Sequence, residues 1–110
     1  MRSGMDSQTV LFKSLSDPTR RALFERLCRE GELTVGLLAE GSGVSQPAIS
    51  KHLAALDRAN LVALRREGRN THCRARPEGI TPLTDWVQDM SRFWDVRLDA
   101  LEDLLRRMDQ

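Results

Sequence analysis

Hydrophobic positions recur with the period of an α-helix in five segments of the chain and with the period of a β-strand in one. The helical segments span about residues 7–15, 18–30, 34–39, 44–62 and 81–108. Asp17, Thr34 and Ser45 stand at three helix starts, where a side-chain oxygen accepts a hydrogen bond from an unpaired backbone amide. Pro18 and Pro47 follow in first turns, which need no amide proton. The pattern predicts a mainly α-helical domain with one small β-hairpin.

Segment 44–62 predicts a helix with two chemically different sides, which we call the reading helix. One side carries the apolar residues Ile49, Leu53, Leu56 and Leu61. The other side carries small, hydrogen-bonding or basic residues, namely Gln46, Ser50, Lys51, Ala54 and Arg58. Small residues let a helix approach base edges closely, and polar ones hydrogen-bond there, so this side suits the major groove of DNA. A solvated helix face without a ligand explains the same residues equally well.

The segments on either side of the reading helix strengthen the case for DNA. A glycine-bearing turn precedes it, so residues 34–60 have the helix-turn-helix arrangement that presents a second helix to a groove. Residues 62–76 predict a two-stranded wing with Arg69 and Asn70 at its tip, away from the core. Basic hairpin tips also occur without a nucleic-acid role, but the neighbouring helix-turn-helix favours DNA contact here.

Segment 81–108 predicts a helix whose apolar side is wider than a small core can cover. We therefore expect a homodimer in which this helix and the first one pair with their symmetry mates. The predicted interface residues are Val10, Leu11, Leu83, Trp86, Val87, Met90, Trp94, Leu98, Leu101 and Leu105. A helix that folds back on its own chain is the alternative. A two-fold dimer would present its two reading helices to successive major grooves, about 34 Å apart, on an inverted repeat.

Length and charge fit this picture. At 110 residues the chain has the length of one domain, which we expect over residues 7–110 after a flexible tail at 1–6, with Met5 as an alternative start. Residues 1–76 hold 13 Lys and Arg against 8 Asp and Glu, whereas residues 77–110 hold 4 against 8. The basic part contains the reading helix and the wing, so it would bind phosphates in a salt-dependent way. The sequence has neither a membrane-spanning apolar run nor a signal peptide, which predicts a cytoplasmic protein.

The sequence offers no group of residues suited to catalysis or to a cofactor. It lacks a nucleophile paired with a base, a phosphate-binding glycine motif and a zinc-ligand spacing. Asp85 and Asp89 lie one helical turn apart, within reach of a hard cation, but beside an arginine they fit a solvated face better. Cys28 and Cys73 are too few for a disulfide framework, and we expect both to be buried, with Cys73 and Ala75 facing inward from the wing. We therefore predict a protein that is not an enzyme and has no metal site.

Four strings of residues, taken in their order along the chain, resemble the ArsR family of winged-helix repressors, which are dimeric bacterial transcription regulators. The strings are Leu15-Ser16-Asp17-Pro18-Thr19-Arg20-Arg21, Glu32-Leu33-Thr34-Val35, Ser45-Gln46-Pro47-Ala48-Ile49-Ser50-Lys51-His52-Leu53 and Arg66-Glu67-Gly68-Arg69. The resemblance covers the chain from Leu11 to about Leu105. It implies that Gln46, Ser50 and His52 contact DNA from the reading helix, and that Arg69 does so from the wing.

The pattern and the resemblance together predict a set of DNA contacts on the reading helix and the wing. The predicted residues are Ser45, Gln46, Pro47, Ser50, Lys51, His52, Arg58, Arg66, Arg69 and Asn70. His52 lies near the edge of the apolar side, so a half-buried packing residue is the alternative for this position.

The chain departs from the metal-sensing members of the family it resembles. Those members place Cys-Val-Cys at the start of the third helix, where this chain has Thr34-Val35-Gly36. Others bind zinc between their last helices through Asp, His and Glu, whereas residues 82–110 of this chain contain no histidine. The resemblance therefore implies a metal-independent branch without a cofactor.

The leading hypothesis is a homodimeric repressor that binds an inverted-repeat operator in double-stranded DNA. The first alternative is a repressor of the same fold that responds to an unidentified small-molecule inducer or to thiol oxidation. The inducer would sit between Trp86, Phe93 and Trp94, and the thiol would be Cys73, which stands where relatives commonly have an aromatic residue. The second alternative is a winged-helix module for protein contact.

Overall fold

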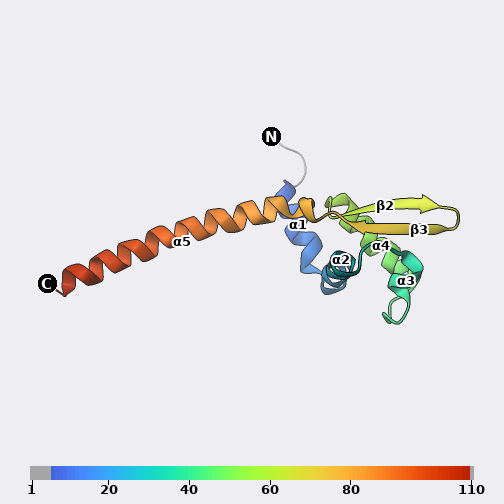
Figure 1. The fold of residues 1–110 in the computed structure, drawn as a ribbon, viewed down its shortest axis with the longest axis horizontal. Coiled ribbons are helices and arrows are strands. Elements are labelled where there is room, and N and C mark those ends of the chain that lie inside the picture. Colours follow the sequence, from blue (N-terminus) through green and yellow to red (C-terminus); the bar gives the residue numbers. More distant parts are fainter. Residues whose placement is uncertain (1–5, 110) are drawn as a thin grey trace.

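The structure, a computed structural model, describes residues 6–109 of the chain. Its elements are, in order, α1 (Ser7–Ser16), α2 (Pro18–Glu30), β1 (Leu33–Thr34), α3 (Val35–Ala39), α4 (Gln46–Arg58), β2 (Val62–Glu67), β3 (Asn70–Ala75), the 3-10 turn η1 (Pro77–Ile80) and α5 (Thr81–Met108). The first four helices and the sheet form a body, from which α5 extends far to one side (Figure 1). The predicted fold, mainly helical with a small wing, is confirmed. Most of the expected tail, including Met5, lies outside the described residues.

The predicted helix starts are formed by side-chain caps. The carboxylate of Asp17 accepts from the amide of Arg20 at 2.9 Å, and the hydroxyl of Ser45 accepts from the amide of Ala48 at 3.3 Å. Thr34 caps α3 in the same way. Asp6, predicted to lie in the flexible tail, caps α1. The first three caps were recognisable because each oxygen-bearing residue directly precedes a helical apolar pattern.

One boundary predicted from the sequence is wrong, and one strand was not predicted. The reading helix α4 ends at Arg58, so Leu61, which the sequence placed on its apolar side, lies beyond the helix and is nevertheless fully buried. Asn60 ends the helical turn with a left-handed φ of 63°, a conformation that asparagine tolerates better than most residues. The sequence also missed β1, because two residues are too few to show a strand period.

The sheet has the order β1-β3-β2 and is antiparallel throughout. Strands β2 and β3 pair from Val62 opposite Ala75 to Glu67 opposite Asn70. Gly68, with a φ of 62°, supplies the left-handed residue that the tight turn between them requires. Cys73 and Ala75 are buried against the helices, which confirms the inward side predicted for the wing.

The core lies within the body and receives little from α5. Its fully buried residues come from α1 to α4, the turn after α4 and the sheet, and they include Leu11, Leu27, Leu38, Ile49, Leu53, Leu56, Leu61, Val62 and Cys73. In α5 no residue is buried, and only Leu83 packs at the edge of the core. The chain measures 73 × 38 × 21 Å, with a radius of gyration of 19.8 Å. A compact chain of this length would have a radius of about 13 Å.

Contacts near its start hold α5 to the body. The ring of Trp86 meets the ring of Phe12 edge-on, with a centroid distance of 5.3 Å. Beyond this contact the helix projects away from the body, so the alternative in which it folds back on its own chain is wrong (Figure 1). Within residues 6–109, every helix is too short or too polar to span a bilayer.

Candidate nucleic-acid interface

The outward side of α4 is fixed by its buried side. Ile49, Leu53 and Leu56 are at most 1% exposed and anchor the helix in the core. Most of the residues predicted to contact DNA then face outward, and those exposed on α4 and its cap are Ser45, Gln46, Pro47, Ser50, Lys51 and Arg58. Because the core sets the rotation of α4, these side chains are presented without any rearrangement of the helix.

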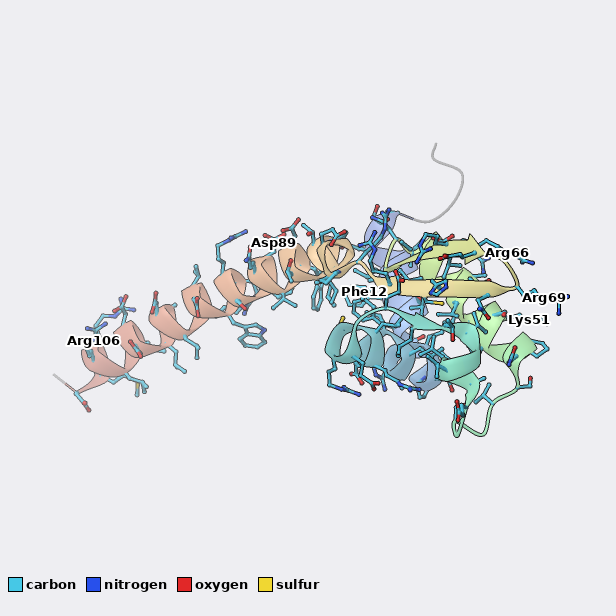
Figure 2. All side chains as sticks on the ribbon, turned by 45° about the vertical axis from the view of Figure 1, so that its right-hand side comes forward. Phe12, Lys51, Arg66, Arg69, Asp89 and Arg106 are labelled. Carbon is cyan, nitrogen blue, oxygen red and sulfur yellow. The ribbon has the colours of Figure 1, made fainter. Side chains whose placement is uncertain are left out.

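The wing adds further cations at the same end of the molecule. Arg66, Arg69 and Asn70 are exposed on the wing near its turn. Figure 2 shows Lys51, Arg66 and Arg69 at the end of the molecule opposite to the tip of α5. Among residues 6–109, none of these three cations pairs with a carboxylate. Their charges are therefore available to an external anion.

His52 lies apart from these exposed residues. Its side chain is 27% exposed, and its Nδ1 lies 3.9 Å from Oδ2 of Asp17, the cap of α2. The pKa of Asp17 is lowered from its ordinary value, mainly by the hydrogen bond from the Arg20 amide and further by the His52 charge. The position favours the alternative role for His52, packing between α4 and α2.

Arg58 also lies away from the other predicted contacts. It occupies the last turn of α4 and lines a hollow of about 800 Å³ between α1, α4 and the start of α5. The carboxylates of Asp6, Glu78 and Asp85 line the same hollow. These acidic neighbours weaken the attraction of Arg58 for a phosphate, and its contact with DNA stays a prediction.

One arginine of the wing is neutralised by its neighbours. Arg65 donates through Nη2 to Oε2 of Glu32 at 2.8 Å and also pairs with Glu67. These hydrogen bonds raise the pKa of Arg65 and lower that of Glu67. His72, opposite Arg65 in the strand register, places Nδ1 3.6 Å from Glu32 and Nε2 3.7 Å from Glu67. The basic excess counted along the sequence therefore overstates the charge that this side of the wing offers to DNA.

The two cysteines differ in their surroundings. Cys73 is fully buried, and burial raises the pKa of its thiol to about 11. Cys28 is exposed, so the expectation that it is buried is wrong. Partial desolvation still raises the pKa of Cys28 above its ordinary value. Both thiols are protonated near neutral pH, a state that disfavours oxidation or metal binding.

Among residues 6–109, no three His, Cys, Asp or Glu side chains lie together in an arrangement able to hold a metal ion. The start of α3 presents Thr34, Val35 and Gly36, and none of these side chains is a common metal ligand.

The second predicted surface is the apolar side of α5. Its large exposed residues are Trp86, Val87, Met90, Phe93, Trp94, Leu98, Leu101, Leu104, Leu105 and Met108. Val10 and Leu83 are half-buried beside this surface. Leu11, which the sequence placed in the same interface, is 1% exposed and packs inside the body, so it is not available to a partner.

Comparison with known proteins gives relatives along most of the chain. A family model described as a helix-turn-helix domain matches residues 15–65. The HTH-type transcriptional regulator Rv2034 of Mycobacterium tuberculosis is 39% identical over 94 residues, which cover 86% of this chain and 84% of that protein. The arsenical resistance operon repressor of Escherichia coli is 42% identical over 99 residues, which cover 89% and 81%.

Solved structures agree with these relatives. An ArsR-like transcriptional regulator from Rhodococcus sp. RHA1 superposes with a TM-score of 0.74 at 31% identity, and the match covers 89% of this chain and 92% of that one. A possible ArsR-family regulator from Mycobacterium bovis, described as a homodimeric winged helix-turn-helix DNA-binding domain, has a TM-score of 0.62 at 26% identity, with coverage of 84% and 91%. The relatives are transcriptional regulators and not enzymes, as predicted. The chain belongs to the ArsR family of winged helix-turn-helix transcriptional regulators.

Proposed function

We propose that the protein is a homodimeric repressor that binds an inverted-repeat operator and has no metal-sensing site. In this proposal residues 34–60 are the helix-turn-helix, 62–76 the wing and 81–108 the dimerisation helix of one domain. The observation that carries it is the separation of two surfaces, unpaired cations at one end of the molecule and an uncovered apolar helix at the other.

Base recognition is assigned to Gln46 and Ser50. Both are exposed on the anchored helix α4, and the amide of Gln46 can donate to and accept from one base edge. Ser45 and Pro47 lie at the start of the same helix, where the backbone approaches a phosphate most easily. These residues would fix the register of α4 in the major groove.

We assign the contacts with the DNA phosphates, which supply most of the affinity, to Lys51, Arg66, Arg69 and Asn70. The three cations have no carboxylate partner among residues 6–109, so a phosphate would meet no competing internal ion pair. Each phosphate contact releases about one condensed counterion, so binding would weaken steeply with salt.

Dimerisation is assigned to α5. An uncovered apolar helix of 28 residues, about 42 Å long, is costly to leave in water, and a two-fold axis lets the same side of two copies cover each other. The similar domain from Mycobacterium bovis is described as homodimeric. Metal independence is supported by the residues at the start of α3, which lack thiolates.

The test is a titration of the protein into the DNA upstream of its own gene and into a scrambled duplex, at several salt concentrations, with and without a chelator. We expect selective, salt-sensitive binding that the chelator does not change. Equal affinity for the two duplexes would contradict a specific repressor, and loss of selectivity with the chelator would contradict metal independence.

Single substitutions distinguish base contacts from phosphate contacts. Gln46→Ala should reduce the free energy of binding to the operator by about 1–3 kcal/mol and change binding to the scrambled duplex little, because only a base contact is lost. Arg69→Ala should weaken binding to both duplexes equally and reduce the slope of log affinity against log salt concentration by about 1. Arg107→Ala, an equal change of charge at the exposed far end of α5, is the matched control and should leave both affinities unchanged.

A further inference from the structure

The end of the reading helix and the beginning of the dimerisation helix meet at a tightly packed junction. The turn after α4 contains Asn60 and Leu61, and η1 leads directly from the wing into α5. The two segments lie side by side where η1 leads into α5. The junction therefore joins the end of α4 to the start of α5.

Gly79 brings the two segments closer than another residue would allow. It is buried, and a Cβ added to it would overlap the carbonyl oxygen of Asn60. The same Cβ would lie 3.5 Å from the Cα of Leu61. Because the obstacle is backbone, a side chain at position 79 would force the turn after α4 away from η1.

Arg76 ties the same segments together by hydrogen bonds. Its backbone amide donates to the carbonyl of Leu61 at 2.7 Å, and its Nη1 donates to Oδ1 of Asn60 at 2.7 Å. Its carbonyl accepts from the amide of Gly79 at 2.9 Å. The Nε of Arg76 is buried without a partner among the described residues, so the bond to Asn60 is what holds this guanidinium in place.

We infer that Asn60, Arg76 and Gly79 form a clamp that sets the angle between the reading helix and the dimerisation helix, and thereby the spacing of the two half-sites that the dimer recognises. The inference rests on the proposed function, since it requires a dimer on an inverted repeat. The three are positioning residues, because they act on DNA only through α4.

A small change in the angle between α4 and α5 is enough to move the reading helix away from its bases. The helix α4 has 13 residues and is about 20 Å long, so a rotation of about 5° at the junction displaces its far end by about 2 Å. A hydrogen bond to a base edge survives only a few tenths of an ångström of displacement. A loosened clamp would therefore spare binding to one half-site and weaken simultaneous binding to two.

Asn60→Gly tests the clamp with little risk to folding. Glycine keeps the left-handed backbone at position 60 without strain, and only the hydrogen bond to Arg76 is lost. Asn60→Asp keeps an acceptor at the same place and serves as the conservative variant. Leu27→Val, a core change in α2 away from the clamp, is the control for a general loss of stability.

The measurement compares affinity for a full operator, for a duplex with one half-site, and for operators whose half-sites are one or two base pairs further apart. We expect Asn60→Gly to lower the affinity for the full operator about tenfold and the affinity for the half-site less than about twofold. Its preference for the native half-site spacing should also be weaker. Asn60→Asp should behave as the wild type. Leu27→Val should lower the melting temperature without changing the spacing preference.

Three results would overturn the inference. If Asn60→Gly keeps the wild-type spacing preference, or weakens binding to the full operator and to the half-site equally, the clamp does not set the spacing. If the wild type itself binds the full operator no better than the half-site, the proposed function fails and the clamp fails with it.

Discussion

Leu101 offers the sharpest test of the dimer, because it lies in the middle of the apolar side of α5 and is 50% exposed in the single chain. Its replacement by alanine removes apolar surface that only a partner can cover. Alanine also favours the helical state more than leucine does, so the variant should not disturb α5 itself. Any weakening of the dimer can then be assigned to the interface.

The expected size of the effect follows from the exposure. Burial of a whole leucine side chain contributes about 1.5–3 kcal/mol, and about half of that remains for a partner to gain at Leu101. A two-fold interface contains the residue twice, so Leu101→Ala should cost about 1.5–3 kcal/mol per dimer. The dissociation constant of the dimer should rise about 10- to 150-fold.

Sedimentation velocity over a dilution series measures this constant. The matched control is Val96→Ala, since Val96 is 68% exposed on the same helix but lies about 140° around it from Leu101. We expect the control to dimerise as the wild type does. An unchanged constant for Leu101→Ala, or an equal loss for both variants, would refute the assignment of this side of α5 to the interface.

Three further outcomes are expected. In a thiol-reagent assay, exposed Cys28 should react in the native protein, whereas buried Cys73 should react only after denaturant is added. Burial raises the pKa of Cys73 from 9.0 to about 11, so the folded state holds the thiol proton more tightly than the unfolded state does. The free energy of unfolding should therefore keep its full value below pH 9 and fall as the pH rises through 11. Urea unfolding at pH 8 and pH 10.5 should show this loss in the wild type and a smaller loss in Cys73→Ala. Glu32→Gln should release Arg65 from one of its two carboxylates and strengthen binding to a scrambled duplex at low salt, and an unchanged affinity would show that Arg65 faces away from DNA.

Local signals made the body predictable. The caps Asp17 and Ser45 and the alternation of the wing each depend on residues within a few positions, so the sequence displays them directly. Cys28 was misplaced because Leu23, Phe24 and Leu27 define the buried side of α2, and position 28 falls at its edge rather than its centre.

Contacts between residues far apart in the chain could not be predicted from the sequence. Strand β1 exists only because it pairs with β3, which lies about forty residues further along the chain. Arg65 contributed to the basic excess counted along the sequence, because its partner Glu32 is 33 residues away. The alternation of Arg65 and Glu67 on one side of β2 was the available signal for part of that pairing.

The architecture separates the energy of folding from the energy of association. Since the core is built from α1 to α4 and the sheet, and α5 contributes no buried residue, substitutions along the exposed side of α5 should leave the stability of the body almost unchanged. They should still weaken operator binding, because a single reading helix and wing make half of the DNA contacts. Operator affinity in such variants should recover at high protein concentration, where mass action restores the dimer. A loss that persists at concentrations where the dimer is complete would instead place the defect at the junction of Asn60, Arg76 and Gly79, which controls the geometry of the dimer and not its population.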